Sequence, residues 1–406
     1  MAEAMKDSKT RWLGQIPVDW DMARVKDCFD RKNKKANQKD PVVLSLARSG
    51  VKIRDISSNE GQLAADYTNY NPVAKDDILI NPMDLVSGDN CNISRVEGVI
   101  SPAYVNLRYK KGINPRFYNY YFKLQYWLGA FFAHGFGVSF DNRWTLSYET
   151  LSKYPLVLPP SDEQDKIADF LDEKCAEIDQ LSEDIQNQID ILEEYKKSVI
   201  TRAVTKGLNP NVKMKDSGAQ WIGDIPSDWT TIPVKYCFTI ENGSDPKTED
   251  GDTPVYGSGS KSFKTCVEFK KGPTVLLGRK GTVNTPQYVE GKYWNVDTAF
   301  NTKTKGGYDL KLFYYAAQCF DYENYSTQTA LPSMTQHDYY NFRLPLMPEE
   351  EQTTIVAFLD KKCNEIIESI NMKRSQLQQL DIYKKSIIYE YVTGKKRVAW
   401  VLSERP

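Results

Sequence analysis

The chain has 406 residues, of which 40% are hydrophobic and 26% are charged, and its formal net charge is −1. This composition is that of a globular protein with two or three domains, and it excludes a disordered chain. Because no apolar run approaches the roughly 18 residues that cross a bilayer and the first residues lack the apolar core of a signal peptide, we expect a cytoplasmic protein.

The first segment of the chain occurs twice. MKDSKTRWLGQIPVDW begins at Met5 and MKDSGAQWIGDIPSDW begins at Met214, 209 residues later. Further along, Cys175 and Cys363 also match, but they are only 188 residues apart. The sequence therefore predicts a tandem duplication with a repeated frame and two inserts that differ in length.

The inserts, at about 30–153 and 239–343, contain strand-like and helix-like stretches. PVVLSLA from Pro41, DDILINP from Asp76 and PTVLLGRKG from Pro273 are short β-branched runs next to turn residues. PRFYNYYFKLQYWLGAFF from Pro115 and YDLKLFYYAAQCF from Tyr308 have the length and spacing of helices. Each insert is predicted to be a compact domain of mixed α/β or α+β class.

Each insert is followed by a long heptad segment, one from Ser161 to about Lys206 and one from Glu349 to Lys395. The sevenfold spacing predicts two coiled-coil helices that each pack against a partner, with Leu181, Ile189, Tyr195, Ile370, Leu377 and Tyr383 in a second seam. Ser161 and Gln164 are predicted to form a capping box. The predicted packing and docking residues are Leu171, Ile178, Ile185, Leu192, Val199, Leu359, Ile366, Leu380 and Ile387.

These elements predict six consecutive parts of the chain. They are a first globular domain (1–154), a first long helix (155–206), a linker (207–220), a second globular domain (221–344), a second long helix (345–395) and a C-terminal tail (396–406).

Charge is distributed unevenly along the chain. Residues 21–153 contain 19 basic and 14 acidic residues, a net charge of +5, whereas residues 155–206 contain 6 and 13, a net charge of −7. The corresponding net charges of the second half are +1 for 230–344 and −2 for 345–393. We therefore expect the first globular domain, and not its helix, to meet phosphates.

The catalytic and metal-binding motifs that we sought are incomplete. The stretch Asn81-Pro82-Met83-Asp84 lacks the second proline and the aromatic residue of an adenine methyltransferase loop, and residues 257–262 lack the glycine before the lysine of a phosphate loop. Asp252, Glu268 and Lys270 have a spacing too common to indicate a nuclease, and two histidines and seven scattered cysteines predict neither a triad nor a metal site. We expect the cysteines to be reduced, with Cys28, Cys175, Cys237 and Cys363 buried.

Binding is the remaining interpretation. Arg, Lys, Asn and Gln side chains contact base edges in the major groove, and Lys, Ser and Thr contact phosphates. Such residues cluster in predicted loops of both inserts, although each cluster alone is more typical of a solvated loop. The candidate DNA-binding residues are Arg48, Lys52, Arg54, Asn90, Asn92, Asn142, Arg143, Lys261, Arg279, Lys280, Asn284, Thr327 and Gln328.

The frame resembles that of the specificity subunits of type I restriction-modification enzymes over nearly its full length. The resemblance rests on the W-[LI]-G-x-I-P-x-x-W segments at Trp12 and Trp221, the runs that begin at Pro155 and Pro345, and the Tyr-Lys-Lys-Ser segments at Tyr195 and Tyr383. It implies that each insert is a target recognition domain for one half of a split DNA site. It also implies that the two long helices pack antiparallel and fix the spacing between the halves, in a pseudo-twofold arrangement.

The same resemblance implies a chain that is not an enzyme on its own. It implies two methylation subunits that carry S-adenosylmethionine, and two motor-nuclease subunits that use ATP and Mg for restriction; this chain would bind no cofactor or metal. Because the inserts diverge, we expect an asymmetric bipartite target. Two alternatives stay open, a coiled-coil adaptor with two protein-binding domains and a stand-alone DNA enzyme.

Overall fold

A computed structural model describes residues 4–47, 50–56, 64, 66–85, 91–137, 144–259, 261–326 and 332–398. The chain forms two compact units, one from residues 1–184 and 377–406 and the other from residues 185–376. Two long helices, α5 (Ser161–Lys206) and α10 (Glu349–Val392), each contribute to both units. The predicted order of a globular domain followed by a long helix, repeated once, is confirmed.

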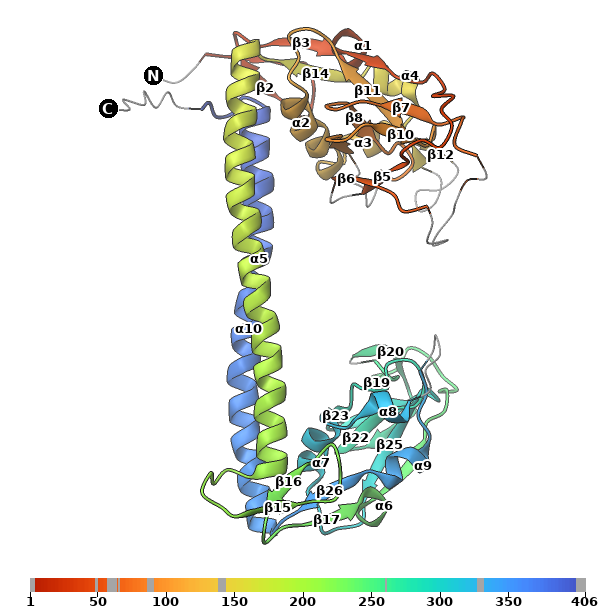
Figure 1. Ribbon diagram of the computed structural model, residues 1–406, viewed down its shortest axis with the longest axis vertical. Helices are drawn as coiled ribbons and strands as arrows, with labels where there is room; N and C mark the ends of the chain where they lie inside the picture. Colours follow the sequence, from red (N-terminus) through yellow and green to blue (C-terminus); the bar gives the residue numbers. More distant parts are fainter. Residues whose placement is uncertain are drawn as a thin grey trace, which may run out of the picture. The chain divides into compact units, whose positions relative to one another are not determined.

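The globular part of the first unit contains a four-stranded antiparallel sheet in the order β4-β11-β8-β9. Helix α2 lies between this sheet and α5 (Figure 1). Its N-cap is Asn114, whose side chain accepts hydrogen bonds from the N–H groups of Arg116 and Phe117, and Pro115 fits the first turn because its missing N–H is not needed there.

The elements of this part follow in chain order. They are β1 (Met5–Asp7), β2 (Gln15–Pro17), β3 (Asp21–Arg24), α1 (Val25–Cys28), β4 (Phe29–Arg31), β5 (Leu44–Ala47), β6 (Gly50–Ile53), β7 (Asn71–Val73), β8 (Ile78–Ile80), β9 (Cys91–Ile93), β10 (Gly98–Ile100), β11 (Val105–Tyr109), α2 (Pro115–Trp127), α3 (Ala130–Ala133), β12 (Phe136–Gly137), β13 (Trp144–Thr145), α4 (Tyr148–Ser152) and β14 (Pro155–Leu158).

The second unit repeats this design. Its sheet β18-β25-β22-β23 has the same antiparallel order, and α7 lies between that sheet and α10 (Figure 1). A second sheet, β20-β19-β24-β21, contains a parallel pair, β19 with β24. The first unit has a parallel bridge at the equivalent place, between Val43 and Val99, which joins the β5-β6 hairpin to the β10-β7 pair.

The remaining elements complete the second unit. They are β15 (Met214–Asp216), β16 (Asp224–Pro226), β17 (Thr230–Pro233), α6 (Val234–Cys237), β18 (Phe238–Asn242), β19 (Thr253–Tyr256), β20 (Ser262–Cys266), β21 (Lys270–Lys271), β22 (Thr274–Gly278), β23 (Gln287–Val289), β24 (Lys292–Asn295), β25 (Ala299–Thr304), α7 (Leu310–Ala317), α8 (Tyr322–Tyr325), α9 (Gln336–Asn341) and β26 (Arg343–Leu346).

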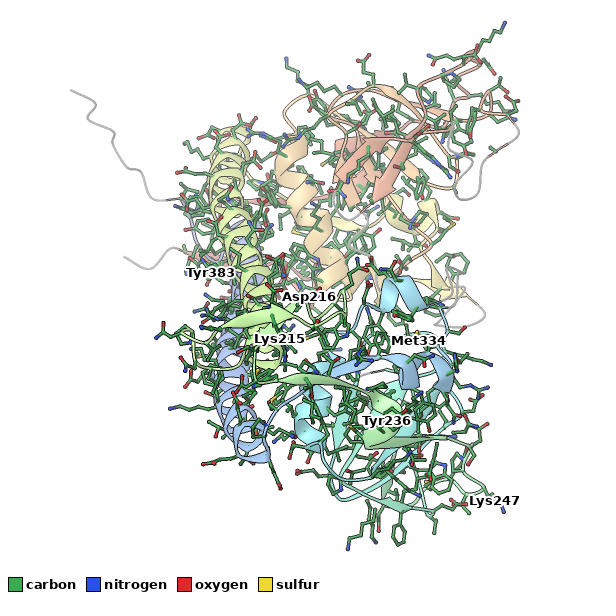
Figure 2. The ribbon with its side chains drawn as sticks, turned by 60° about the horizontal axis from the view of Figure 1, so that its bottom comes forward. Lys215, Asp216, Tyr236, Lys247, Met334 and Tyr383 are labelled. Carbon is green, nitrogen blue, oxygen red and sulfur yellow. The ribbon has the colours of Figure 1, made fainter. Side chains whose placement is uncertain are left out.

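Strands flank the long helices where the sequence divides the chain. Residues 155–158 form β14, which pairs with β3, and residues 214–216 within the expected linker form β15, which pairs with β16. Figure 2 labels Lys215 and Asp216 on β15. Part of the expected linker therefore belongs to the second unit as a paired strand, as β1, paired with β2, does in the first unit.

The two long helices pack antiparallel within each unit. In the first unit Lys384 Nζ lies 2.6 Å from Asp179 Oδ1, and the Phe170 ring packs against the Tyr391 ring at a tilt of 40°, with ring centroids 4.4 Å apart. In the second unit Arg374 pairs with Glu193 at 2.9 Å. In the second unit Glu351, near the start of α10, also lies beside Gly207, directly after the end of α5. In both units, therefore, residues later in α5 contact residues earlier in α10, which confirms the antiparallel packing.

The predicted heptad residues are all buried or half-buried, but the second seam is partly wrong. Leu181, Tyr195 and Tyr383 are 48%, 48% and 56% exposed. The packed second seam lies four residues after the heptad positions, where Cys175 and Ile189 are buried. The residues three and four positions after a first-seam residue lie on opposite sides of that residue on the helix surface. When the side with the +4 residues packs against the partner helix, the +3 residues are left in solvent.

The predicted capping box at Ser161 is also wrong. Ser161 is the first residue of α5, and the carbonyl of Pro160 accepts hydrogen bonds from the N–H groups of Glu163 and Gln164. The Gln164 amide instead donates to the Pro159 carbonyl and accepts from the N–H of Asn114. The residue that we expected in the cap joins the helix to the globular domain.

Two further observations bear on the protein class. All seven cysteines are free, and the four predicted to be buried are buried. Among the residues that the structure describes, none of the helices is both long enough and apolar enough to cross a membrane.

Candidate nucleic-acid interface

Each globular domain is attached to a long helix by the same set of contacts. Trp20 donates its indole N–H to Glu163 at 2.8 Å, and the repeat-related Trp229 donates to Glu351 at 2.9 Å. Both tryptophans are fully buried, and both acceptors lie in the first turn of a long helix. The repeated sequence frame thus holds each domain at the start of its helix.

A second repeated contact is centred on an aspartate of the long helix. Asp172 accepts hydrogen bonds from Tyr120 at 2.7 Å and from Arg116 at 2.8 Å. Asp360 accepts equivalent bonds from Tyr315 at 2.6 Å and Lys311 at 2.7 Å. Burial, together with the bond to Asp360, raises the pKa of Tyr315, so this phenol stays a donor.

Six of the thirteen candidate contacts fall outside the described residues. These are Arg48, Asn90, Asn142, Arg143, Thr327 and Gln328. They stay predictions.

The candidates of the first domain that the structure describes cluster at the β5-β6 hairpin. Lys52 is exposed on β6, and Arg54 follows the strand and is half-buried. Asn92 is buried, and its amide donates to the Ala47 carbonyl at 2.6 Å. Asn92 thus joins β9 to the hairpin, and the DNA-binding roles of Lys52, Arg54 and Asn92 stay predictions.

In the second domain the candidates occupy two neighbouring turns. Lys261 is exposed just before β20. Arg279, Lys280 and Asn284 lie between β22 and β23, where Lys280 and Asn284 are exposed and Arg279 donates to the Asp297 carbonyl at 3.2 Å. Asn284 also lines the cleft described next.

A cleft lies between the recognition domain and the long helices in each unit. In the first unit it has a volume of about 810 Å³ and includes Arg95, Lys384 and Lys385. In the second unit it has a volume of about 530 Å³ and includes Lys196, Lys197 and Asn284. Sequence analysis missed these lysines because they belong to helices with a net negative charge; the repeated Tyr-Lys-Lys-Ser segment was the signal.

Glu268 and Lys270, two of the three side chains considered for a nuclease, form hydrogen bonds within the protein. Glu268 accepts a hydrogen bond from the N–H of Lys247, a residue labelled in Figure 2, and another from the Thr248 hydroxyl. The Lys270 ammonium donates to Asn295 at 2.7 Å and Asn301 at 2.8 Å, and burial lowers its pKa. The described residues hold no group of three side chains arranged for a metal ion.

Comparison with known sequences assigns the family. The model of the type I restriction modification DNA specificity domain matches residues 17–190 and again 226–379. These two matches cover most of the chain and coincide with the two structural repeats. The chain belongs to the type I restriction-modification specificity subunits.

Individual relatives agree with this assignment. The putative type I restriction enzyme MjaX specificity subunit of Methanocaldococcus jannaschii is 24% identical, and the alignment covers 95% of this chain and 96% of the relative. The MjaVIII specificity subunit of the same organism is also 24% identical, with 95% and 94% covered.

A solved structure agrees in fold. A chain from work on complex assembly and conformational transition of the type I R-M system has a TM-score of 0.70 at 13% identity, with 94% of this chain and 99% of that chain covered. The specificity-subunit fold is therefore present here, with a mixed α/β domain before each long helix.

Proposed function

We propose that this specificity subunit recognises a bipartite, asymmetric double-stranded DNA site, with one half-site for each globular domain. The proposal rests on a contrast between two parts of the chain. The segments that attach each domain to its long helix make the same contacts in both units, whereas the inserts differ. Trp20 and Trp229 make the same bond, whereas the β5-β6 hairpin, which carries Lys52, and the β19-β20 hairpin, which carries Lys261, differ in sequence and length. Different side chains on equivalent frames favour two different half-sites.

The long helices are proposed to set the distance between the half-sites. Helix α5 has 46 residues and α10 has 44. At a rise of roughly 1.5 Å per residue, each is about 65–70 Å long. A continuous helix resists compression, so the number of residues between the two domain attachments would determine the spacer.

The helices are also proposed to bind two methylation subunits. Several large apolar side chains on them are exposed, including Ile191, Phe358, Met372, Ile382 and Tyr383, the last labelled in Figure 2. An apolar surface of this kind favours a protein partner. S-adenosylmethionine would be bound by these subunits, which would methylate adenine at N6.

Two motor-nuclease subunits, with ATP and Mg, would add restriction to the full complex, and this chain would have no catalytic activity of its own. Because the proposed target is the DNA of the cell and of invading elements, the proposal places the chain in the cytoplasm. The second domain has a net charge of only +1 over residues 230–344, so we expect it to need the methylation subunits to hold DNA firmly.

The proposal is tested by single-molecule sequencing of modified adenines in cells with and without the gene. We expect a gene-dependent motif with two different half-sites and a fixed spacer. A symmetric repeat of one half-site would contradict the asymmetry. No gene-dependent motif, together with no salt-dependent DNA affinity of the complex, would favour the structural adaptor.

A further inference from the structure

The two clefts contain equivalent lysines from the distal ends of the long helices. Lys196 and Lys197 of α5 line the cleft of the second unit, and Lys384 and Lys385 of α10 line that of the first. Both pairs come from the repeated Tyr-Lys-Lys-Ser segment. Each recognition domain therefore faces lysines of the long helix that follows the other domain in the sequence.

Helix packing does not account for the first lysine of each pair. Lys196 and Lys384 lie four residues after Leu192 and Leu380, in the second seam. At the same heptad position in earlier turns of α5, Cys175 and Ile189 are buried. An apolar side chain at these positions would add packing, and a lysine removes it. Lys196 also precedes the helix end at Lys206 by ten residues, which is too far for the helix dipole to favour its charge.

The local charge of the helix differs from its average charge. Residues 195–206 include four basic residues and no acidic one, although residues 155–206 have a net charge of −7. In the second unit none of the described residues that line the cleft is acidic; beside Lys196 and Lys197 they include Asn284, Gln287 and Gln318. The lining thus offers an anion two ammonium groups and several amides.

The first unit has the same net charge with a different composition. Its cleft is lined by six basic and four acidic residues, a net charge of +2. Lys384 pairs with Asp179 at 2.6 Å and Lys385 with Asp381 at 2.7 Å. Exposed cations remain on the opposite wall at Lys75 and Arg95.

We propose that Lys196 and Lys197 in one unit, and the Lys384–Lys385 cleft in the other, bind backbone phosphates of the DNA duplex that the adjoining domain recognises. The inference rests on the proposed function and adds the long helices to the DNA-binding surface. Duplex DNA is favoured over an acidic protein segment because the second cleft combines two lysines with Asn284, a candidate for base contact. In protein–DNA complexes lysine side chains often bind backbone phosphates, whereas amide side chains often bind base edges. The phosphates would contribute affinity without sequence preference.

The second unit gives the cleaner test because its lysines have no carboxylate among the described lining residues. The double variant K196Q/K197Q is compared with K361Q/K362Q, a matched lysine pair on α10 of the same unit that lies outside the cleft lining. Each full chain is purified with its methylation subunits, and the affinity for DNA with and without the methylated motif is measured across a salt series.

We expect the cleft variant to lower the slope of log affinity against log salt by about 1 to 2 and to weaken binding to both DNAs roughly tenfold at about 0.1 M salt. The methylated motif should stay unchanged, and K361Q/K362Q should match the wild type. A wild-type slope in the cleft variant would overturn the inference. Loss of co-purifying methylation subunits, with the DNA slope unchanged, would also overturn it and would assign the cleft to an acidic protein segment.

The wild-type complex separates this inference from the proposed function. If the wild type binds its motif specifically and the cleft variant keeps the full salt slope, only the role of the lysines fails. If the wild type shows no specific binding, the proposed function itself fails.

Discussion

Replacement of Asp360 by alanine should loosen the second recognition domain from its helix and leave the first domain unchanged. Asp360 accepts bonds from Tyr315 and Lys311 of α7, and Asp172 does the same for α2 in the first unit. The two aspartates are equivalent contacts in one chain. Each domain therefore serves as the internal control for the other.

The expected loss follows from the exposure of the partners. The bond from the buried Tyr315 to a carboxylate contributes about 1.5 kcal/mol. Lys311 and Asp360 are 34% and 32% exposed, so solvent screening limits their ion pair to about 0.5 kcal/mol. A total of about 2 kcal/mol corresponds to roughly 30-fold faster local opening.

Hydrogen exchange of the complex, followed by mass spectrometry, measures this opening. In Asp360→Ala, peptides from α7 should exchange roughly 30-fold faster while those from α2 keep the wild-type rate. Asp172→Ala should give the reverse pattern, and Asp360→Asn should lose less because the amide oxygen still accepts from Tyr315. Unchanged exchange in α7, or equal acceleration in both helices, would refute the assignment of these aspartates as local attachment points.

Three further predictions concern the spacer, a close contact and pH. Insertion of one heptad after both Gln186 and Gln376 should lengthen the spacer in the methylated motif and preserve both half-sites; an unchanged spacer in adenine sequencing would contradict the role of the helices. Both Gly394 and Gly112 have positive φ, so alanine at either position should lower the free energy of unfolding by about 1 kcal/mol through backbone strain. Gly394→Ala should lower it further, because only at Gly394 would the added Cβ meet a neighbour, Pro17, at 2.4 Å. Equal losses for the two variants in urea titrations would argue against this contact. Burial raises the pKa of Asp77, although Arg108 lowers it, so the folded state binds the proton more tightly than the unfolded state does. The wild type should therefore gain stability relative to Asp77→Asn as the pH falls from 7 toward 4. The opposite trend in pH-dependent urea titrations would contradict this prediction.

The sequence by itself determined the parts of this protein that depend on local pattern. The heptads predicted α5 and α10, which begin at Ser161 and Glu349, directly after the proline-flanked strands β14 and β26. The paired Trp-x-Gly-x-Ile-Pro segments predicted a duplicated frame, and the structure shows Trp20 and Trp229 in equivalent bonds. Burial of Cys175 and Cys363 followed from their equivalence.

Only the tertiary structure decided which polar side chains are available. Asn92 and Lys52 are both polar residues near strands in the sequence, but the amide of Asn92 is consumed by the Ala47 carbonyl whereas Lys52 is exposed. Lys196 looked like one cation on an acidic helix, and the fold places it in a cleft beside Asn284, about 90 residues away in sequence. Such distinctions depend on contacts between distant segments, which local pattern and average charge do not specify.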